Sequence, residues 1–169
     1  DDEGIPVNDF KYVGVEVKRT TMPANVKPLV KKIIETMLLT QDQHQTNKEV
    51  EAVYDTFVGL NVEEIAEVSG IKGLEKYASL SDGFVTAKGM PHHVKAAYHY
   101  NMLLNKLGID KKYEKIQSGD KIKHFAVKTP NRYGIKKIAY KYYYPEEFKA
   151  LFEPDYEKMF EKIVYSVVE

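Results

Sequence analysis

Cysteine and tryptophan are both absent from this 169-residue sequence. Without cysteine the chain has no disulfide, no thiolate nucleophile and no cysteine-bound zinc, which suits a reducing compartment. No apolar run approaches the roughly 18 residues of a membrane-spanning helix, so we expect no membrane partner. The composition that remains, 43% hydrophobic and 30% charged, is that of one ordinary globular domain and excludes a disordered or low-complexity chain.

Charge is balanced over the whole chain but segregated along it. The 25 basic and 25 acidic side chains cancel, yet residues 1–83 carry a net −6, residues 84–141 a net +10 and residues 142–169 a net −4. Such asymmetry predicts a surface that faces a polyanion on a protein of neutral total charge. The alternative is a solvated lysine-rich face without a partner.

Apolar periodicity predicts several helices. The spacing of Val26, Val30, Ile33 and Met37 predicts a helix from Pro23 to about residue 40. After a polar loop over 41–46, Asn47 is expected to cap a second helix that ends at Gly59. The strongest pattern runs from 91 to 107, with Val94, Ala97, Tyr98, Met102 and Leu104 facing inward. Shorter helices are expected after Pro145 and Pro154.

Strand signals are fewer. Residues 10–19 alternate as a strand, and short strands are expected over 122–128 and 135–140, joined by a turn that contains Pro130, Asn131 and Gly134. Residues 62–78 are expected to form a short element, a turn and a second short element. The fold class is therefore α+β, mostly helical with a small antiparallel sheet.

The residue patterns indicate no catalytic centre. Acidic pairs such as Glu63-Glu64 occur at helix starts, where they complement the helix dipole, whereas a two-metal site needs carboxylates that converge at the ends of buried strands. His92, His93 and His99 lack a third ligand at helical spacing, so no zinc helix is expected. No glycine-rich phosphate loop, nucleophile elbow or Ser/His/Asp arrangement is visible.

A binding site for phosphates is better supported. Lys88 and Lys95 bracket the start of the 91–107 helix, where free backbone N–H groups and the helix dipole attract anions. Lys72, Lys76 and Tyr77 add donors around two small glycine turns. Donors of this kind position a duplex without recognising its base sequence.

Several short motifs follow one another along the chain. They are Phe10-Lys11-Tyr12 with Arg19-Thr20-Thr21-Met22-Pro23, Glu64 to Tyr77, Pro91-His92-His93-Val94-Lys95, Gly119-Asp120-Lys121, Pro130 to Gly134, and Asp155-Tyr156-Glu157-Lys158. In order and spacing, these motifs resemble the end of the palm and the thumb of family B replicative DNA polymerases, closest to the bacteriophage branch. The resemblance covers nearly the whole chain, although each motif alone is short.

The resemblance implies a palm-edge strand segment over 1–22 and a thumb domain over 23–169. It implies that Lys11 and Tyr12 lie in the minor groove near the primer end. The residues that would hold primer and duplex phosphates are Ser69, Lys72, Lys76, Tyr77, Lys88, His93 and Lys95. Phe10 stands where many members of the family have another basic residue, which weakens the expected minor-groove contact.

The expected partners are primer–template DNA, the remainder of the polymerase (palm, fingers and exonuclease) and a sliding clamp bound through a C-terminal tail. The palm aspartates are not in this sequence, so we expect a fragment that is inactive alone. It needs no cofactor of its own, whereas the parent enzyme would use Mg²⁺ and deoxynucleoside triphosphates. The expected location is the cytoplasm, that of the bacterial host if a phage encodes the protein.

Two other interpretations stay open. In the first interpretation, the chain is a free-standing, non-enzymatic nucleic-acid-binding protein. In the second it is a protein-interaction domain whose basic middle segment meets an acidic partner or its own acidic termini.

Overall fold

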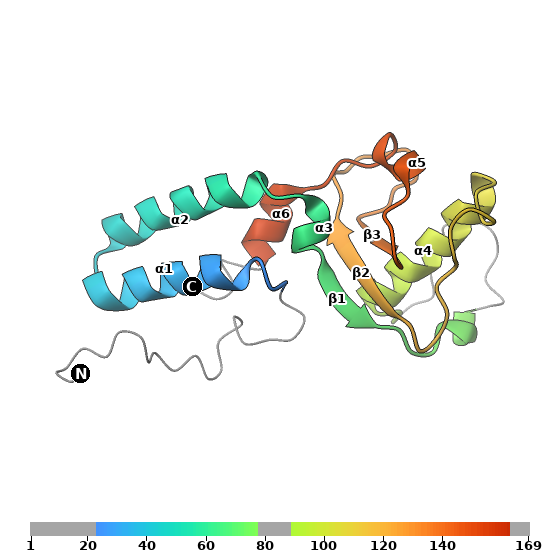
Figure 1. Ribbon diagram of the computed structural model, residues 1–169, viewed down its shortest axis with the longest axis horizontal. Coiled ribbons are helices and arrows are strands. Elements are labelled where there is room, and N and C mark those ends of the chain that lie inside the picture. Colours follow the sequence, from blue (N-terminus) through green and yellow to red (C-terminus); the bar gives the residue numbers. More distant parts are fainter. Residues whose placement is uncertain (1–22, 78–88, 163–169) are drawn as a thin grey trace. The chain divides into compact units, whose positions relative to one another are not determined.

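The computed structural model describes residues 23–77 and 89–162, which form two compact units. One unit comprises residues 23–65 and 156–162, and the other comprises residues 66–77 and 89–155. The expected strand over 10–19 and the palm-edge segment 1–22 lie outside the described residues. Helices predominate and a small antiparallel sheet accompanies them, so the predicted α+β class is confirmed (Figure 1).

The first unit is built on two long helices, α1 (Lys27–Thr40) and α2 (Gln43–Val58). Pro28 lies in the first turn of α1, where its missing N–H costs no hydrogen bond. Val30, Ile33 and Ile34 are buried, as the periodicity predicts. Leu38, at the far end of the same apolar stripe, is 48% exposed.

The predicted start of the second helix at Asn47 is wrong. Asp42 is the N-cap, because its side chain accepts hydrogen bonds from the backbone N–H groups of His44 (2.9 Å) and Gln45 (3.4 Å). The chain turns between the helices through Gln41, whose φ of +52° is left-handed. The expected loop over 41–46 is therefore mostly the first turn of α2.

Two short helices, α3 (Val62–Ile65) and α6 (Tyr156–Phe160), complete this unit. The ring of Phe160 lies 4.9 Å from that of Tyr54 and 5.5 Å from that of Phe57. Tyr156 donates a hydrogen bond to the carbonyl of Leu60 at 2.9 Å. These contacts hold the C-terminal segment against the end of α2.

The second unit contains the sheet, in the order β1 (Glu67–Gly70), β2 (Lys121–Ala126) and β3 (Lys137–Tyr140). Both pairings are antiparallel, and His124 lies opposite Glu67 on one side and opposite Ala139 on the other. The two strands expected near 122–128 and 135–140 are confirmed. The unit also holds η3 (Leu74–Tyr77), α4 (His92–Lys106) and α5 (Glu146–Lys149).

Helix α4 packs on the sheet, chiefly against β3 (Figure 1). All five residues predicted to face inward on this helix are buried. The core continues into a group of aromatic rings in edge contact, among them Tyr100 with Phe148 at 5.9 Å and Phe125 with Tyr144 at 5.2 Å. This packing fixes the start of α4 and the end of β1 within one unit, and both carry predicted site residues.

Candidate nucleic-acid interface

The turn that follows β1 carries three of the predicted phosphate-binding residues, Lys72, Lys76 and Tyr77. Pairing of β1 with the chain before β2 continues past the strand, because Ile71 donates from N–H to the carbonyl of Asp120 at 2.9 Å. Gly73 then reverses the chain with φ at +72°, a conformation that glycine adopts without strain. The backbone N–H of Lys76 donates to the Gly73 carbonyl at 3.1 Å and starts η3.

Ser118 attaches η3 to the loop that precedes β2. Its hydroxyl oxygen accepts a hydrogen bond from the N–H of Leu74 at 3.0 Å, and the hydroxyl donates to Glu75 Oε1 at 2.6 Å. The hydrogen bond from Ser118 is the main reason that the pKa of the Glu75 carboxyl is lowered. The carboxylate therefore stays ionised and keeps the turn attached to the loop at neutral pH.

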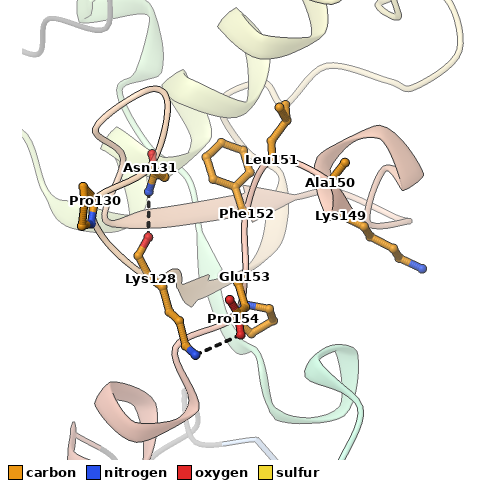
Figure 2. Close-up of a pocket in the computed structure, with 9 residues that line it drawn as sticks. All are labelled: Lys128, Pro130, Asn131, Lys149, Ala150, Leu151, Phe152, Glu153 and Pro154. Carbon is orange, nitrogen blue, oxygen red and sulfur yellow. Dashed lines mark hydrogen bonds and ion pairs between the residues drawn. The ribbon is translucent and has the colours of Figure 1, made fainter.

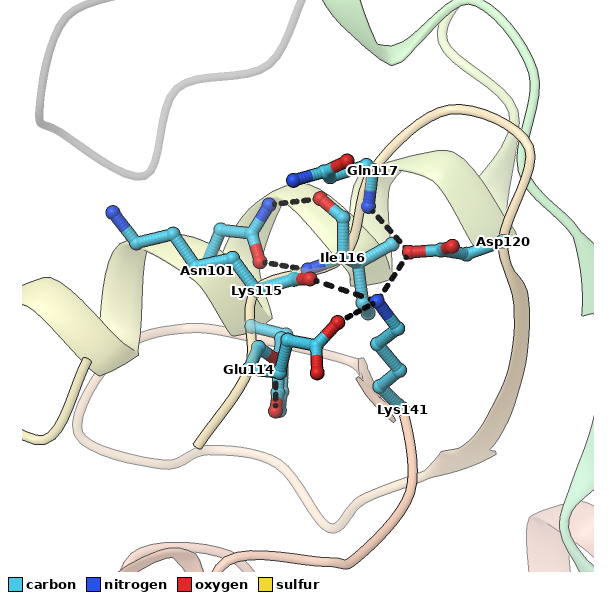
Figure 3. A network of polar contacts seen from close by, with 8 residues as sticks. Asn101, Glu114, Lys115, Ile116, Gln117, Asp120 and Lys141 are labelled. Atoms are coloured by element: carbon cyan, nitrogen blue, oxygen red, sulfur yellow. Dashed lines mark hydrogen bonds and ion pairs between the residues drawn. The ribbon is translucent and has the colours of Figure 1, made fainter. Parts of the chain in front are cut away.

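That loop is itself held by a polar network with residues of α4 and with Lys141, which directly follows β3 (Figure 3). The Asn101 amide donates to the Ile116 carbonyl at 2.9 Å and accepts from the Ile116 N–H at 2.8 Å. The Lys141 ammonium contacts Glu114 at 2.6 Å and Asp120 at 2.9 Å. Although burial by itself lowers the pKa of Lys141, its hydrogen bonds to the two carboxylates raise that pKa above the ordinary value.

A second polar cluster joins β1, β2 and the start of α4. Strand alternation places Glu67 and Ser69 on the same face of β1. Ser69 Oγ and His124 Nε2 share a hydrogen bond of 2.7 Å, and His124 Nδ1 lies 3.7 Å from Glu67 Oε1. The ring of His93, in the first turn of α4, lies 6.3 Å from that of His124. Lys137 of β3 pairs with Glu67 at 3.2 Å.

The cluster contains the residue types of a Ser–His–acid triad, an arrangement that sequence spacing did not reveal. The 3.7 Å separation of His124 Nδ1 from Glu67 is longer than a hydrogen bond, and Lys137 lies closer to the same carboxylate oxygen. The glutamate therefore does not orient the imidazole as a nucleophilic serine requires. We interpret the group as a charge cluster beneath a half-exposed serine.

His93 lies in this cluster as a neutral donor or acceptor rather than as a cation. Its pKa is lowered, first by burial and then by the positive charge of Lys137 and the neighbouring His92. A neutral imidazole at this position can hydrogen-bond to a phosphate oxygen without adding to the net charge of the site.

The structure brings some of the predicted residues together and separates others. Ser69 and His93 both contact His124, Ser69 by a hydrogen bond and His93 by its ring. The turn with Lys72, Lys76 and Tyr77 directly follows the strand that carries Ser69. Lys95 follows His93 by two residues on α4, so its side chain points about 200° away around the helix axis. Lys11, Tyr12 and Lys88 lie outside the described residues.

The predicted cations differ in their pairing from four lysines of the basic segment, residues 84–141. Within residues 23–77 and 89–162, no carboxylate lies at ion-pair distance from Lys72, Lys76 or Lys95. Four lysines of the basic segment do form ion pairs with carboxylates, in the pairs Lys112–Glu147, Lys128–Glu153, Lys137–Glu67 and Lys141–Asp120. Two of those carboxylates, Glu147 and Glu153, come from the acidic C-terminal segment, as the protein-interaction hypothesis expects.

Two cavities accompany the surface of this unit. One, of about 530 Å³, lies between the turn after β2 and the chain after α5 (Figure 2). Its two lysines are paired, Lys128 with Glu153 and Lys149 with Glu146, both at 2.9 Å, so it offers an anion little unbalanced charge. The other, of about 590 Å³, is bordered by Tyr77 and lies between η3 and α4.

Sequence reasoning missed His124, Ser118 and Asn101, which position the predicted residues. His124 was the one with a signal, since it is a polar residue in the inward row of a predicted strand, between Ile122 and Ala126. Where side chains are described, no group of three or more His, Asp or Glu residues could hold a metal ion.

Comparison with known proteins adds no family assignment: no family model and no curated protein matches this chain. In the part of the chain that the structure covers, no helix has the length and apolar character to cross a membrane.

Proposed function

We propose that the second unit holds the sugar–phosphate backbone of a DNA duplex, as the thumb segment of a family B replicative polymerase. In this proposal Ser69, Lys72, Lys76, Tyr77 and His93 bind successive phosphates of the primer strand. Lys95, on a different side of α4, binds a phosphate farther along the duplex. In such a polymerase, a palm domain would perform nucleotidyl transfer with Mg²⁺ and deoxynucleoside triphosphates.

The observation that carries the proposal is the contrast in charge pairing. Four lysines of the basic segment contact carboxylates, whereas Lys72 and Lys76, exposed on the turn after β1, have no carboxylate at ion-pair distance among the described residues. In the proposal, these exposed lysines supply positive charge, and the half-exposed Ser69 and the neutral His93 supply directed hydrogen bonds, as binding to phosphates requires.

The test is a salt titration of primer–template binding, followed by fluorescence anisotropy. If Lys72, Lys76 and Lys95 each neutralise one phosphate, log affinity should fall with log salt concentration at a slope of about −3 or steeper. Lys72→Ala with Lys76→Ala should reduce that slope by about 2 and weaken binding equally for unrelated DNA sequences. The matched control is Lys149→Ala, which removes an exposed lysine of the same unit that is paired with Glu146.

The protein-interaction hypothesis is favoured by a separate observation, the contacts of Glu147 and Glu153 with Lys112 and Lys128. It predicts no duplex binding even at low salt. Duplex affinity that does not change with salt concentration would contradict the DNA-binding proposal. So would a loss of affinity in the Lys72→Ala, Lys76→Ala variant that is no greater than the loss in the Lys149→Ala control. A free-standing DNA-binding protein would pass this titration but would not restore synthesis to a polypeptide that carries the palm aspartates.

A further inference from the structure

His124 is nearly buried, with 4% of its surface exposed, yet it contacts the half-exposed Ser69 directly. The imidazole is therefore too enclosed to reach a ligand itself, and its hydrogen bond to the serine hydroxyl connects it to the surface. We infer that His124 is a positioning residue that decides whether Ser69 donates its hydrogen bond inward or to a backbone phosphate. This inference rests on the proposed function.

The argument begins with the single proton of the hydroxyl, which can serve one acceptor at a time. The negative charge of Glu67, 3.7 Å from Nδ1, favours the neutral tautomer that carries its proton on that nitrogen, although the distance is too long for a hydrogen bond. In this tautomer Nε2 is an acceptor, so Ser69 donates inward at 2.7 Å and its lone pairs face outward. A phosphate oxygen is an acceptor as well, and it finds no donor there. In this state Ser69 does not support binding.

Protonation of His124 reverses the direction of that hydrogen bond. Both nitrogens of an imidazolium donate, so Ser69 accepts from Nε2 and its own proton becomes available to a phosphate. Nδ1–H then faces the Glu67 carboxylate. A hydrogen bond to a charged phosphate is stronger than one between neutral groups, so the protonated state binds the duplex more tightly.

The surrounding charges determine when this happens. Glu67 of β1, Lys137 of β3 and His93 of α4 lie around His124. The other titratable groups on these elements are Lys121 and Lys123 of β2, Tyr140 of β3, and His92, Lys95, Tyr98, His99, Tyr100 and Lys106 of α4. The positive charge of Lys137, which contacts Glu67, disfavours a second cation on His124, and added negative charge nearby would favour it. A phosphate beside Ser69 supplies that charge, and phosphate binding and protonation of His124 therefore favour each other.

The experiment measures duplex affinity at constant ionic strength from pH 6 to pH 8. For the unaltered chain we expect affinity to fall by about tenfold over this range, since one charge-assisted hydrogen bond is gained or lost. His124→Gln has an amide that donates to Ser69 at every pH, so it should bind tightly without pH dependence. Ser69→Ala should bind weakly without pH dependence, and adding it to His124→Gln should weaken binding without restoring a pH effect.

The control variant is His44→Asn, an exposed histidine of α2 in the other unit, which should keep the full pH dependence. His93→Asn removes the neighbouring imidazole ring. This variant should keep most of the pH dependence of duplex affinity. If His124→Gln retains the slope of the unaltered chain, the inference is overturned while the proposed function stands. If the unaltered chain binds no duplex at pH 6 and low salt, both are overturned.

A second measurement uses the unaltered chain and does not depend on whether a variant folds. The ¹⁵N resonances of the His124 ring report its protonation directly. Because the coupling is reciprocal, a tenfold effect on affinity requires that saturating duplex move the midpoint of His124 titration upward by about one pH unit. An unchanged midpoint refutes the inference, and an upward shift supports it.

Discussion

The hydrogen bonds of Asn101 give the sharpest test of how the candidate interface is supported. Its amide forms two hydrogen bonds with the backbone of Ile116, a residue that is 2% exposed. Asn101→Ala leaves a buried N–H and a buried carbonyl without these partners, and each such loss costs about 1–3 kcal/mol. Because Asn101 is itself half-buried, water can replace some of the lost hydrogen bonds to the backbone of Ile116. We therefore expect the second unit to be destabilised by about 2–3 kcal/mol.

The control for this change is Asn105→Ala, one turn farther along α4 at an exposed position. Both variants gain the same helix propensity from alanine, so the difference between them isolates the contacts with Ile116. Because the described chain forms two units, a single unfolding curve does not report on the second unit alone. Residue-resolved amide exchange at Ile116 and at the buried Leu103 is therefore the decisive measurement.

The expected result is faster exchange at Ile116 in Asn101→Ala, with protection in the first unit unchanged. Duplex affinity should also fall, because Ile116 belongs to the loop that holds η3 through Ser118. If the exchange free energies of the two variants agree within about 0.5 kcal/mol, the amide is not a support of the loop and the reasoning fails.

Three further outcomes follow from the structure. Gly73→Ala should destabilise the turn by about 1 kcal/mol, because φ is +72° and the added methyl would lie 3.3 Å from Lys76 Cε; unchanged duplex affinity would contradict a role for this turn. The pKa of Asp120 is lowered by its hydrogen bonds to the Gln117 N–H and to Lys141, so its contribution to stability is complete above its ordinary pKa of 3.8 and is lost as pH falls through the lower folded value; acid titration of amide exchange near 120 should show that loss. Tyr156→Phe removes a hydrogen bond in the first unit, so amide exchange in α2 should register a loss of about 1 kcal/mol while duplex affinity stays the same.

The sequence predicted those parts of the fold whose signals are local. Helix α4 was predicted within a residue at each end, because its apolar residues recur at helical spacing and glycine follows it. The start of α2 was missed because Asp42 and Asn47 are both good caps, and only the backbone shows which one binds free N–H groups. β1 has four residues, too few for an alternation pattern to stand out.

The candidate site was predictable only where a single segment carries it. Lys72, Lys76 and Tyr77 follow one another on a turn, so their proximity needs no knowledge of the fold. The contact of Ser69 with His124 joins residues 55 positions apart, and it depends on a strand pairing that no local pattern encodes. The opposite orientations of His93 and Lys95 were available from helix geometry alone, although a linear motif presents them as neighbours.

The pairing of β1 with β2 also has a consequence for biosynthesis. During translation Glu67 and Ser69 emerge well before His124, so β1 leaves the ribosome without the strand that completes its ladder. Closing a contact of this sequence separation costs chain entropy and slows folding relative to the local helices. The α1–α2 pair can fold on the nascent chain, whereas the surface proposed to hold DNA forms only after β2 has been synthesised.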